Sequence, residues 1–179
     1  MRKVCGFTLI ELVVVLAMIA ITLAIAGPVM DSIVGNNRSS AYANSLLSAL
    51  RLARSEAVMR GEPVALCAMN DPADPSAGCA SDWTGGWMLF TDSETTTPGA
   101  LGGSESVLKV WDEALPGATI EDPDASSLGF VRFLPNGSRD PANGASRLRV
   151  RFAGCTGQQN RLLIISNTGF VEVVPSVCS

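Results

Sequence analysis

Apolar residues are concentrated at the start of the chain. Between positions 12 and 27 no charged residue occurs, and Thr22 has the only polar side chain. Extending this run to positions 7–30 gives 24 residues, interrupted by Glu11 alone. About 20 apolar residues in a helix cross a bilayer, so this pattern predicts a transmembrane segment over 7–30. The basic residues Arg2 and Lys3 before it predict a cytoplasmic N-terminus and an exported remainder.

A helical period continues beyond the apolar run, on a more polar background. Small and aliphatic residues recur at helical spacing and form one stripe: Ala43, Leu46, Leu50, Ala53 and Ala57. Gly61 follows as a stop signal, with Pro63 two residues later. We therefore expect one helix from Phe7 to about Arg60, whose amphipathic half over 31–61 packs on a folded domain. Pro28 is expected to kink or break it.

From Pro63 onward the pattern changes to short β-type runs separated by turn residues. The candidate strands are Val64–Met69, Trp87–Thr91, Val107–Asp112, Phe130–Leu134, Leu148–Phe152, Leu162–Ser166 and Phe170–Val174. Trp83, Trp87 and Phe90 are interpreted as core packing, and Asn167-Thr168-Gly169 predicts a tight hairpin. The stretch from Asp92 to Glu105 is expected to be an exposed, mobile loop.

The expected fold class is α+β. A long N-terminal helix, transmembrane in its first half, packs on an antiparallel β-sheet head domain over 62–179. The chain of 179 residues is long enough for one such domain with its own core.

Cysteine usage agrees with export. Four of the five cysteines follow the apolar run: Cys67, Cys79, Cys155 and Cys178. Four cysteines beyond a translocating segment indicate two disulfides, for which three connectivities exist. The local pairs Cys67–Cys79 and Cys155–Cys178 are favoured, because each closes a segment between expected strand ends.

No residue set predicts catalysis, a metal or a cofactor. The chain has no histidine and no Cys-x-x-Cys pair, which leaves a zinc site without support. Ser106 and Lys109 match a Ser-x-x-Lys pattern by chance, since its companion motifs are missing. We expect a non-enzymatic protein without a cofactor.

Charge is distributed unevenly along the head. Residues 61–124 hold twelve acidic side chains against Lys109 alone, a formal charge of −11. Residues 125–179 hold six arginines against two acidic residues, a formal charge of +4. Such asymmetry can orient a subunit against neighbours of opposite sign. One strand face carries three arginines and is a candidate nucleic-acid or partner surface: Arg147, Arg149 and Arg151. Three more arginines are expected near it: Arg132, Arg139 and Arg161.

The N-terminus allows three interpretations. It matches a secretory signal peptide with a small-x-small site at Ala24-Ile25-Ala26, whose cleavage would leave a soluble domain starting near Gly27. Glu11 inside the apolar region and Pro28 after the cut count against this interpretation. A plain single-span anchor explains the apolar length but gives Glu11 no role.

The third interpretation follows from the residues Gly6-Phe7-Thr8-Leu9-Ile10-Glu11. They resemble the type IV pilin superfamily, in which a short basic leader ends in Gly and precedes Phe-Thr-Leu-Ile-Glu and a long apolar run. The resemblance implies the pilin fold, a leader over 1–6, prepilin peptidase cleavage between Gly6 and Phe7, and N-methylation of Phe7. It also implies that Glu11 pairs with the N-terminal amine of a neighbouring subunit. Either charge left alone in an apolar environment costs several kcal/mol, so Glu11 favours a registered neighbour.

Four further blocks narrow the resemblance to minor pilins of the GspH/FimT type: Ala53–Val58, Trp83–Asp92, Phe133–Gly137 and Ile165–Gly169. The resemblance implies a structural subunit that helps to initiate type IV pilus assembly near the tip. Its implied partners are other minor pilins, the major pilin and the prepilin peptidase/methyltransferase. The implied location is the inner membrane, as a single-pass protein with a periplasmic head, and afterwards the extracellular pilus.

Two alternatives remain for the function. A minor pseudopilin of a type II secretion system has a similar leader and fold. Some FimT-type proteins act in DNA uptake and carry Gly-Arg-x-Arg in the terminal hairpin. The matching stretch here is Gly169-Phe170-Val171-Glu172, which lacks both arginines and has one acidic position. The resemblance therefore does not favour nucleic acid as a partner.

Overall fold

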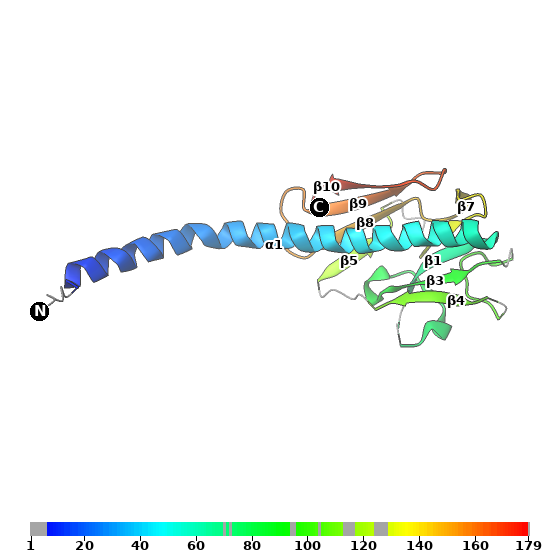
Figure 1. Ribbon diagram of the computed structural model, residues 1–179, viewed down its shortest axis with the longest axis horizontal. Coiled ribbons are helices and arrows are strands. Elements are labelled where there is room, and N and C mark those ends of the chain that lie inside the picture. Colours follow the sequence, from blue (N-terminus) through cyan, green and yellow to red (C-terminus); the bar gives the residue numbers. More distant parts are fainter. Residues whose placement is uncertain are drawn as a thin grey trace, which may run out of the picture.

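The first half of one long helix projects from a β-rich head, and its second half lies along that head (Figure 1). This computed structural model describes residues 7–69, 71, 73–93, 96–103, 105–112, 117–123 and 129–178. The side chains of residues 24–32 and 84 lie outside that description, as do residues 1–6 with the predicted cleavage residue Gly6.

Helix α1 covers Leu9–Arg60 without interruption. Its N-cap is Thr8, and it ends at Gly61, whose φ of 68° lets the backbone N–H donate to the Ala57 carbonyl. The predicted break at Pro28 is wrong, because the helix continues through that position. Proline removes one hydrogen bond of the ladder, and the intact turns on both sides of it keep the helix continuous. Figure 1 shows only gentle curvature there.

Two antiparallel sheets form the head. The strands of the first are β1 (Val64–Met69), β2 (Cys79–Ala80), β3 (Trp87–Thr91), β4 (Val107–Trp111), β6 (Phe130–Phe133) and β7 (Arg139–Gly144). The strands of the second are β5 (Ala118–Glu121), β8 (Arg147–Phe152), β9 (Asn160–Ile165) and β10 (Val171–Ser176). Their orders are β4-β3-β1-β6-β7, with β2 beside β1, and β10-β9-β8-β5. Two short 3-10 helices, η1 (Pro75–Ala77) and η2 (Trp83–Gly85), flank β2.

The second half of α1 packs against both sheets. Every residue of the predicted stripe from Ala43 to Ala57 is fully buried, which confirms its role as core. Tyr42 meets Trp87 of the first sheet and Phe152 of the second edge-on, with ring centroids 5.5 and 6.4 Å away. Trp83, Trp87 and Phe90 are also buried, as expected.

The first sheet has a second apolar cluster on the face away from α1. Met69, Met88, Phe90 and Phe130 form it together with Cys67, so β1 is buried along its whole length. A disulfide joins Cys67 to Cys79 and thereby β1 to β2. A second disulfide joins Cys155, after β8, to Cys178, after β10. These are the two local pairings that the sequence favours.

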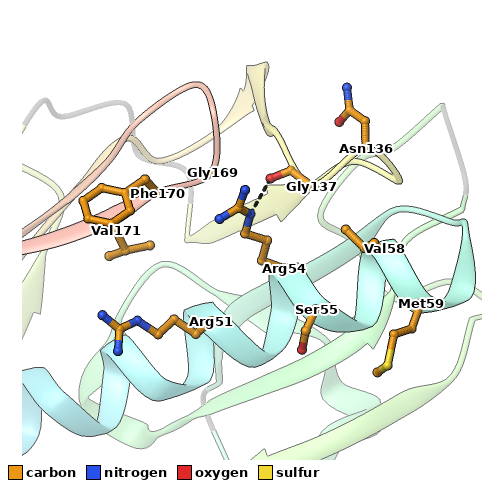
Figure 2. A pocket seen from close by; sticks show the side chains of 10 residues that line it. All are labelled: Arg51, Arg54, Ser55, Val58, Met59, Asn136, Gly137, Gly169, Phe170 and Val171. Atoms are coloured by element: carbon orange, nitrogen blue, oxygen red, sulfur yellow. Dashed lines mark hydrogen bonds between the residues drawn. The ribbon is translucent and has the colours of Figure 1, made fainter.

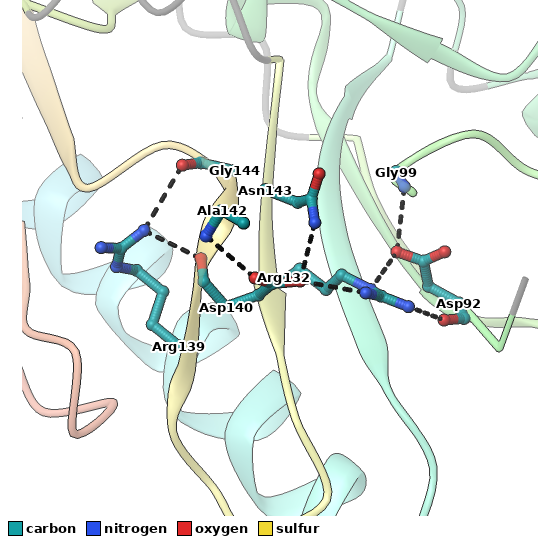
Figure 3. Close-up of polar contacts among 8 residues, drawn as sticks. All are labelled: Asp92, Gly99, Arg132, Arg139, Asp140, Ala142, Asn143 and Gly144. Carbon is teal, nitrogen blue, oxygen red and sulfur yellow. Dashed lines mark hydrogen bonds and ion pairs between the residues drawn. The ribbon is translucent and has the colours of Figure 1, made fainter. Parts of the chain in front are cut away.

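An arginine with two carboxylates ties the loop after β3 to β6 and β7 (Figure 3). Asp92 is fully buried, and its Oδ2 lies 2.9 Å from Arg132 Nε and accepts from Gly99 N–H at 2.9 Å. Arg132 Nη1 lies 3.0 Å from Asp140 Oδ2, while Nη2 donates to the Asp92 carbonyl. The expectation of an exposed loop over 92–105 is thus wrong at Asp92 and Gly99, because Arg132 holds the Asp92 carboxylate inside and that carboxylate holds Gly99.

The two carboxyl groups titrate in opposite directions. Burial raises the pKa of Asp92, and it outweighs the hydrogen bond from Gly99 and the charge of Arg132. Burial also opposes ionisation of Asp140, but hydrogen bonds from Asn143, Arg132 and the Ala142 N–H outweigh it and hold the pKa of Asp140 below 3.8. The hydrogen bonds around Asp140 therefore favour its ionised form beside Arg132.

Two turns meet beside the end of α1. Gly169, in the predicted β9–β10 hairpin turn, has a φ of +77°, and a Cβ there would lie 2.0 Å from the Gly137 carbonyl oxygen. Gly137 lies in the β6–β7 turn, and its carbonyl accepts a 2.8 Å hydrogen bond from Arg54 Nε of α1. A glycine at position 169 is thus required for both backbone conformation and space.

Gly169→Ala is expected to destabilise the head more than Gly154→Ala. Both glycines have positive φ, so both variants pay about 1 kcal/mol of backbone strain. Nothing lies within 4 Å of a Cβ at Gly154. Only Gly169→Ala adds a clash, worth roughly 1–3 kcal/mol. Thermal unfolding of the detergent-solubilised chain, followed by the fluorescence of its buried tryptophans, measures the difference. Equal melting temperatures would contradict the close approach.

Asp140→Asn is expected to cost roughly 2 kcal/mol near neutral pH, because a charge-assisted hydrogen bond to Arg132 is lost. Since the folded-state pKa of Asp140 is lowered, its contribution is complete above pH 3.8 and disappears as pH falls through the folded-state value. The gap in unfolding free energy between wild type and variant should therefore shrink below pH 3.8.

Urea titrations at several pH values measure that gap. Glu56→Gln is the control, because Glu56 forms an exposed i,i+4 pair with Arg60. Such a pair contributes about 0.5 kcal/mol or less. If Asp140→Asn lowers the free energy of unfolding by no more than Glu56→Gln does, the buried pair does not stabilise the head.

Candidate assembly site

The first turn of α1 forms a reciprocal cap. The Glu11 N–H donates to Thr8 Oγ1 at 3.4 Å, and the Thr8 N–H donates to Glu11 Oε2 at 3.4 Å. Thr8 Oγ1 also donates to Glu11 Oε2 at 3.3 Å. This capping box satisfies backbone donors that a helix start leaves unpaired. A negative side chain here also meets the positive end of the helix dipole.

Sequence reasoning missed the role of Thr8. The spacing Thr8-x-x-Glu11 directly before an apolar run is the pattern of a capping box and was visible in the chain. It means that Glu11 has a local function in addition to the implied pairing with a neighbour. The predicted assembly residues Phe7 and Glu11 lie on the same exposed turn.

Glu11 keeps acceptor capacity for a partner. Its contacts with Thr8 use only Oε2, and they are longer than the 2.7–3.2 Å usual for strong hydrogen bonds. No described residue contacts Oε1. A cation from another molecule can therefore approach this carboxylate without unfolding the cap.

The apolar half of α1 has no partner within the described chain. Phe7, Leu9 and Ile10 are 78%, 81% and 70% exposed, and all described side chains up to Leu23 are exposed. Water is a poor environment for so much contiguous apolar surface, which marks an interaction site. Among the residues described, no helical segment meets the length and hydropathy needed to cross a membrane.

The predicted arginine face exists on β8 but is partly neutralised. Leu148 and Val150 point into the core, so the three arginines lie on the opposite side, as expected. Arg149 Nη1 lies 3.3 Å from Glu121 Oε1, and Arg151 Nη1 lies 3.2 Å from Glu121 Oε2. Arg147 is exposed on the same face but is also engaged within the chain.

The three other arginines expected nearby do not extend this face. Arg132 is held by Asp92 and Asp140, and Arg139 is 7% exposed and donates to Asn167 Oδ1. Arg161 donates to Asn36 and Ser40 of α1, which fixes the β8–β9 loop to the helix. The prediction of a wider basic patch is therefore wrong, because these side chains satisfy buried or inter-element contacts.

Within the described parts of the chain, no group of three His, Cys, Asp or Glu side chains is arranged to hold a metal ion.

A long helix that projects from a two-sheet head, with Glu11 in the cap at its start, defines a pilin-type subunit. The family model for the type II transport protein GspH matches residues 42–169. This chain belongs to the GspH family. The model for the prokaryotic N-terminal methylation motif matches residues 1–27.

The head resembles solved pilin structures. Two crystal forms of the type IV minor pilin FimU of Pseudomonas aeruginosa strain PAO1 align with TM-scores of 0.54 and 0.55, at 23% and 20% identity. The alignments cover 76% and 78% of this chain and 92% and 90% of the FimU chains. At this identity the likeness shows the fold, which is the pilin fold. No curated protein matches the chain.

Proposed function

We propose that this chain is a minor pilin, a structural subunit that enters a type IV pilus through the first half of α1. The exposed apolar helix whose first turn is capped by Thr8 and Glu11 is the observation that carries the proposal. Such a surface needs lipid before assembly and neighbouring helices afterwards. A non-enzymatic role agrees with this architecture.

Glu11 supplies the register of assembly. In an apolar filament core its carboxylate would lose water, a cost of several kcal/mol unless a cation replaces it. The amine that processing creates at Phe7 of a neighbouring subunit is such a cation. Pairing the two fixes one helix against the next, whereas apolar contacts alone would allow sliding. The open Oε1 supports this role.

Processing precedes assembly. The match to the N-terminal methylation motif supports cleavage between Gly6 and Phe7 and methylation of Phe7 by a prepilin peptidase. Before that step the chain is anchored in the inner membrane by residues 7–30, with its N-terminus cytoplasmic and its head periplasmic. The two disulfides of the head suit an oxidising periplasm.

Within the pilus we assign the chain to the complex of minor pilins that primes assembly near the tip. The likeness to FimU, a type IV minor pilin, supports the minor-pilin class, and the priming role near the tip is what the sequence resemblance implies. A minor pseudopilin of a type II secretion system is the second candidate, which the description of the matching GspH family supports. DNA binding has less support, since Glu121 partly neutralises the β8 arginines.

Glu11→Ala is expected to abolish detectable incorporation into sheared filaments, because both the cap and the charge are lost. Glu11→Gln separates the two roles, since glutamine also forms a capping box but cannot neutralise an amine. We expect Glu11→Gln to be as defective as Glu11→Ala. Thr8→Ala should be incorporated, because it weakens the cap by about 1 kcal/mol and keeps the charge. Immunoblots of sheared filaments measure all three.

Mass spectrometry of the mature N-terminus is the control for these variants. Each should begin with N-methyl-Phe7, so that a loss of incorporation reflects assembly and not processing. A wild-type chain that begins at Gly27 would overturn the proposal in favour of a secretory signal peptide. Normal incorporation of Glu11→Gln would restrict Glu11 to its capping role.

Deletion of the gene is expected to remove surface pili and leave type II secretion intact. Electron microscopy counts the pili, and the activity of a secreted hydrolase in the culture medium reports secretion. The matched control is complementation with the wild-type chain, which should restore pili. Loss of secretion with normal pili would assign the chain to the secretion system.

A further inference from the structure

A groove lies where the last turns of α1 meet the β6–β7 and β9–β10 turns. Its volume is about 520 Å³, and its walls come from three separate parts of the chain (Figure 2). Arg51, Val58 and Met59 line it from α1, and Phe170 and Val171 line it from the start of β10. This end of the head is opposite to the end from which the apolar helix projects (Figure 1).

The groove gathers three exposed apolar side chains in one place. Met59 is 71% exposed, Phe170 is 60% exposed and Val58 is 52% exposed. The main core residues are fully buried by comparison, including the aromatic side chains Trp87 and Phe133. Three large apolar groups gathered in one concavity therefore form a surface that gains free energy when another apolar side chain covers it.

The rim of the groove is basic. Arg51 is exposed and has no hydrogen-bond or charged partner among the described residues. Arg54 Nε is occupied by the Gly137 carbonyl, which holds this second guanidinium at the groove wall. Figure 2 shows both arginines on the groove side of α1. The groove therefore matches a ligand that carries an apolar side chain next to a carboxylate.

We propose that this groove binds a segment from the head of a neighbouring, different filament subunit. An apolar side chain of that segment lies on Met59 and Phe170, and an adjacent Asp or Glu pairs with Arg51. The proposal rests on the proposed function. Because the groove lies at the end of the head opposite to the projecting apolar helix, a segment bound there leaves that helix free for its own contacts.

The composition of the groove favours a protein segment over nucleic acid. A nucleic-acid site needs several cations spaced along a phosphate backbone. Here Arg51 is the exposed cation without a hydrogen-bond or charged partner among the described lining residues. A short acidic and apolar segment requires only one cation beside an apolar floor.

Photo-crosslinking in intact piliated cells tests the proposal on the full-length chain. The photoreactive amino acid p-benzoylphenylalanine replaces Phe170 in the groove, and in a separate control it replaces Val107 on β4. Val107 is 37% exposed, and β4 is the edge strand of the first sheet. Adducts are purified through a tag on this chain and sequenced by mass spectrometry, and sheared filaments are probed for the chain in parallel.

The Phe170 position should give one dominant adduct with the head of another pilin-type subunit, with an Asp or Glu within two residues of the crosslinked side chain. Adding Arg51→Glu should reduce that adduct about tenfold through like-charge repulsion. Arg51→Lys should retain most of it. For each Arg51 variant the adduct is normalised to the amount of this chain in the sheared filaments, so that a change in incorporation is not taken for a change in groove binding.

Several results would overturn the groove assignment while the proposed function stands. One is a chain that enters filaments but gives no adduct from position 170, or one that gives as much adduct from position 107. Another is an adduct with a second copy of this chain, or an adduct that nuclease removes. The last is an adduct in the Arg51→Glu background that is as abundant as without that change. Absence of the wild-type chain from filaments would instead refute the proposed function, and the groove assignment with it.

Discussion

The stripe of alanines and leucines on the second half of α1 is the contact on which the head depends. Ala49, Ala53 and Ala57 are fully buried, and their short side chains let the helix approach the sheets closely. The helix contacts β1 and β6 of one sheet and β8 and β9 of the other, so it provides part of the core of both. The head is consequently fixed to a rigid rod whose other end begins at Thr8.

Much of this fold could be predicted from the sequence, and among the strands that were not predicted, β2, β5 and β7, the last has a clear physical cause. β1 and β3 have the predicted bounds, because strands buried on both faces appear as continuous apolar runs. β7 was missed since Arg139–Gly144 contains Pro141 and no large apolar residue. It is an edge strand, where proline is tolerated, and its buried side chains are the polar Arg139 and Asp140. Local hydrophobic pattern contains no signal for such a strand.

Polar pairing across the sequence was equally invisible. Arg132 lies 40 residues from Asp92, and Glu121 lies 28 residues from Arg149, so no local spacing links them. Composition therefore suggested an exposed loop and a wide basic patch. The structure contradicts the patch, and it contradicts the loop only at Asp92 and Gly99, which are buried. At the helix start, by contrast, the unusual place of Glu11 in an apolar run made it a candidate assembly residue, and that role stays a prediction. Its partner Thr8 is three residues away, which is the range where sequence spacing is informative.

The length of α1 separates two kinds of recognition. A helix of 52 residues is roughly 78 Å long, so events at Glu11 and at the far end of the head are too distant for direct electrostatic coupling. Under the proposed function, the apolar start uses one carboxylate and a general hydrophobic surface, which suit any helix of the same kind. The far end presents a shaped groove with a particular charge, which suits few partners. A filament subunit can therefore keep a common assembly mechanism at one end while the other end determines its neighbours, because neither constrains the residues of the other.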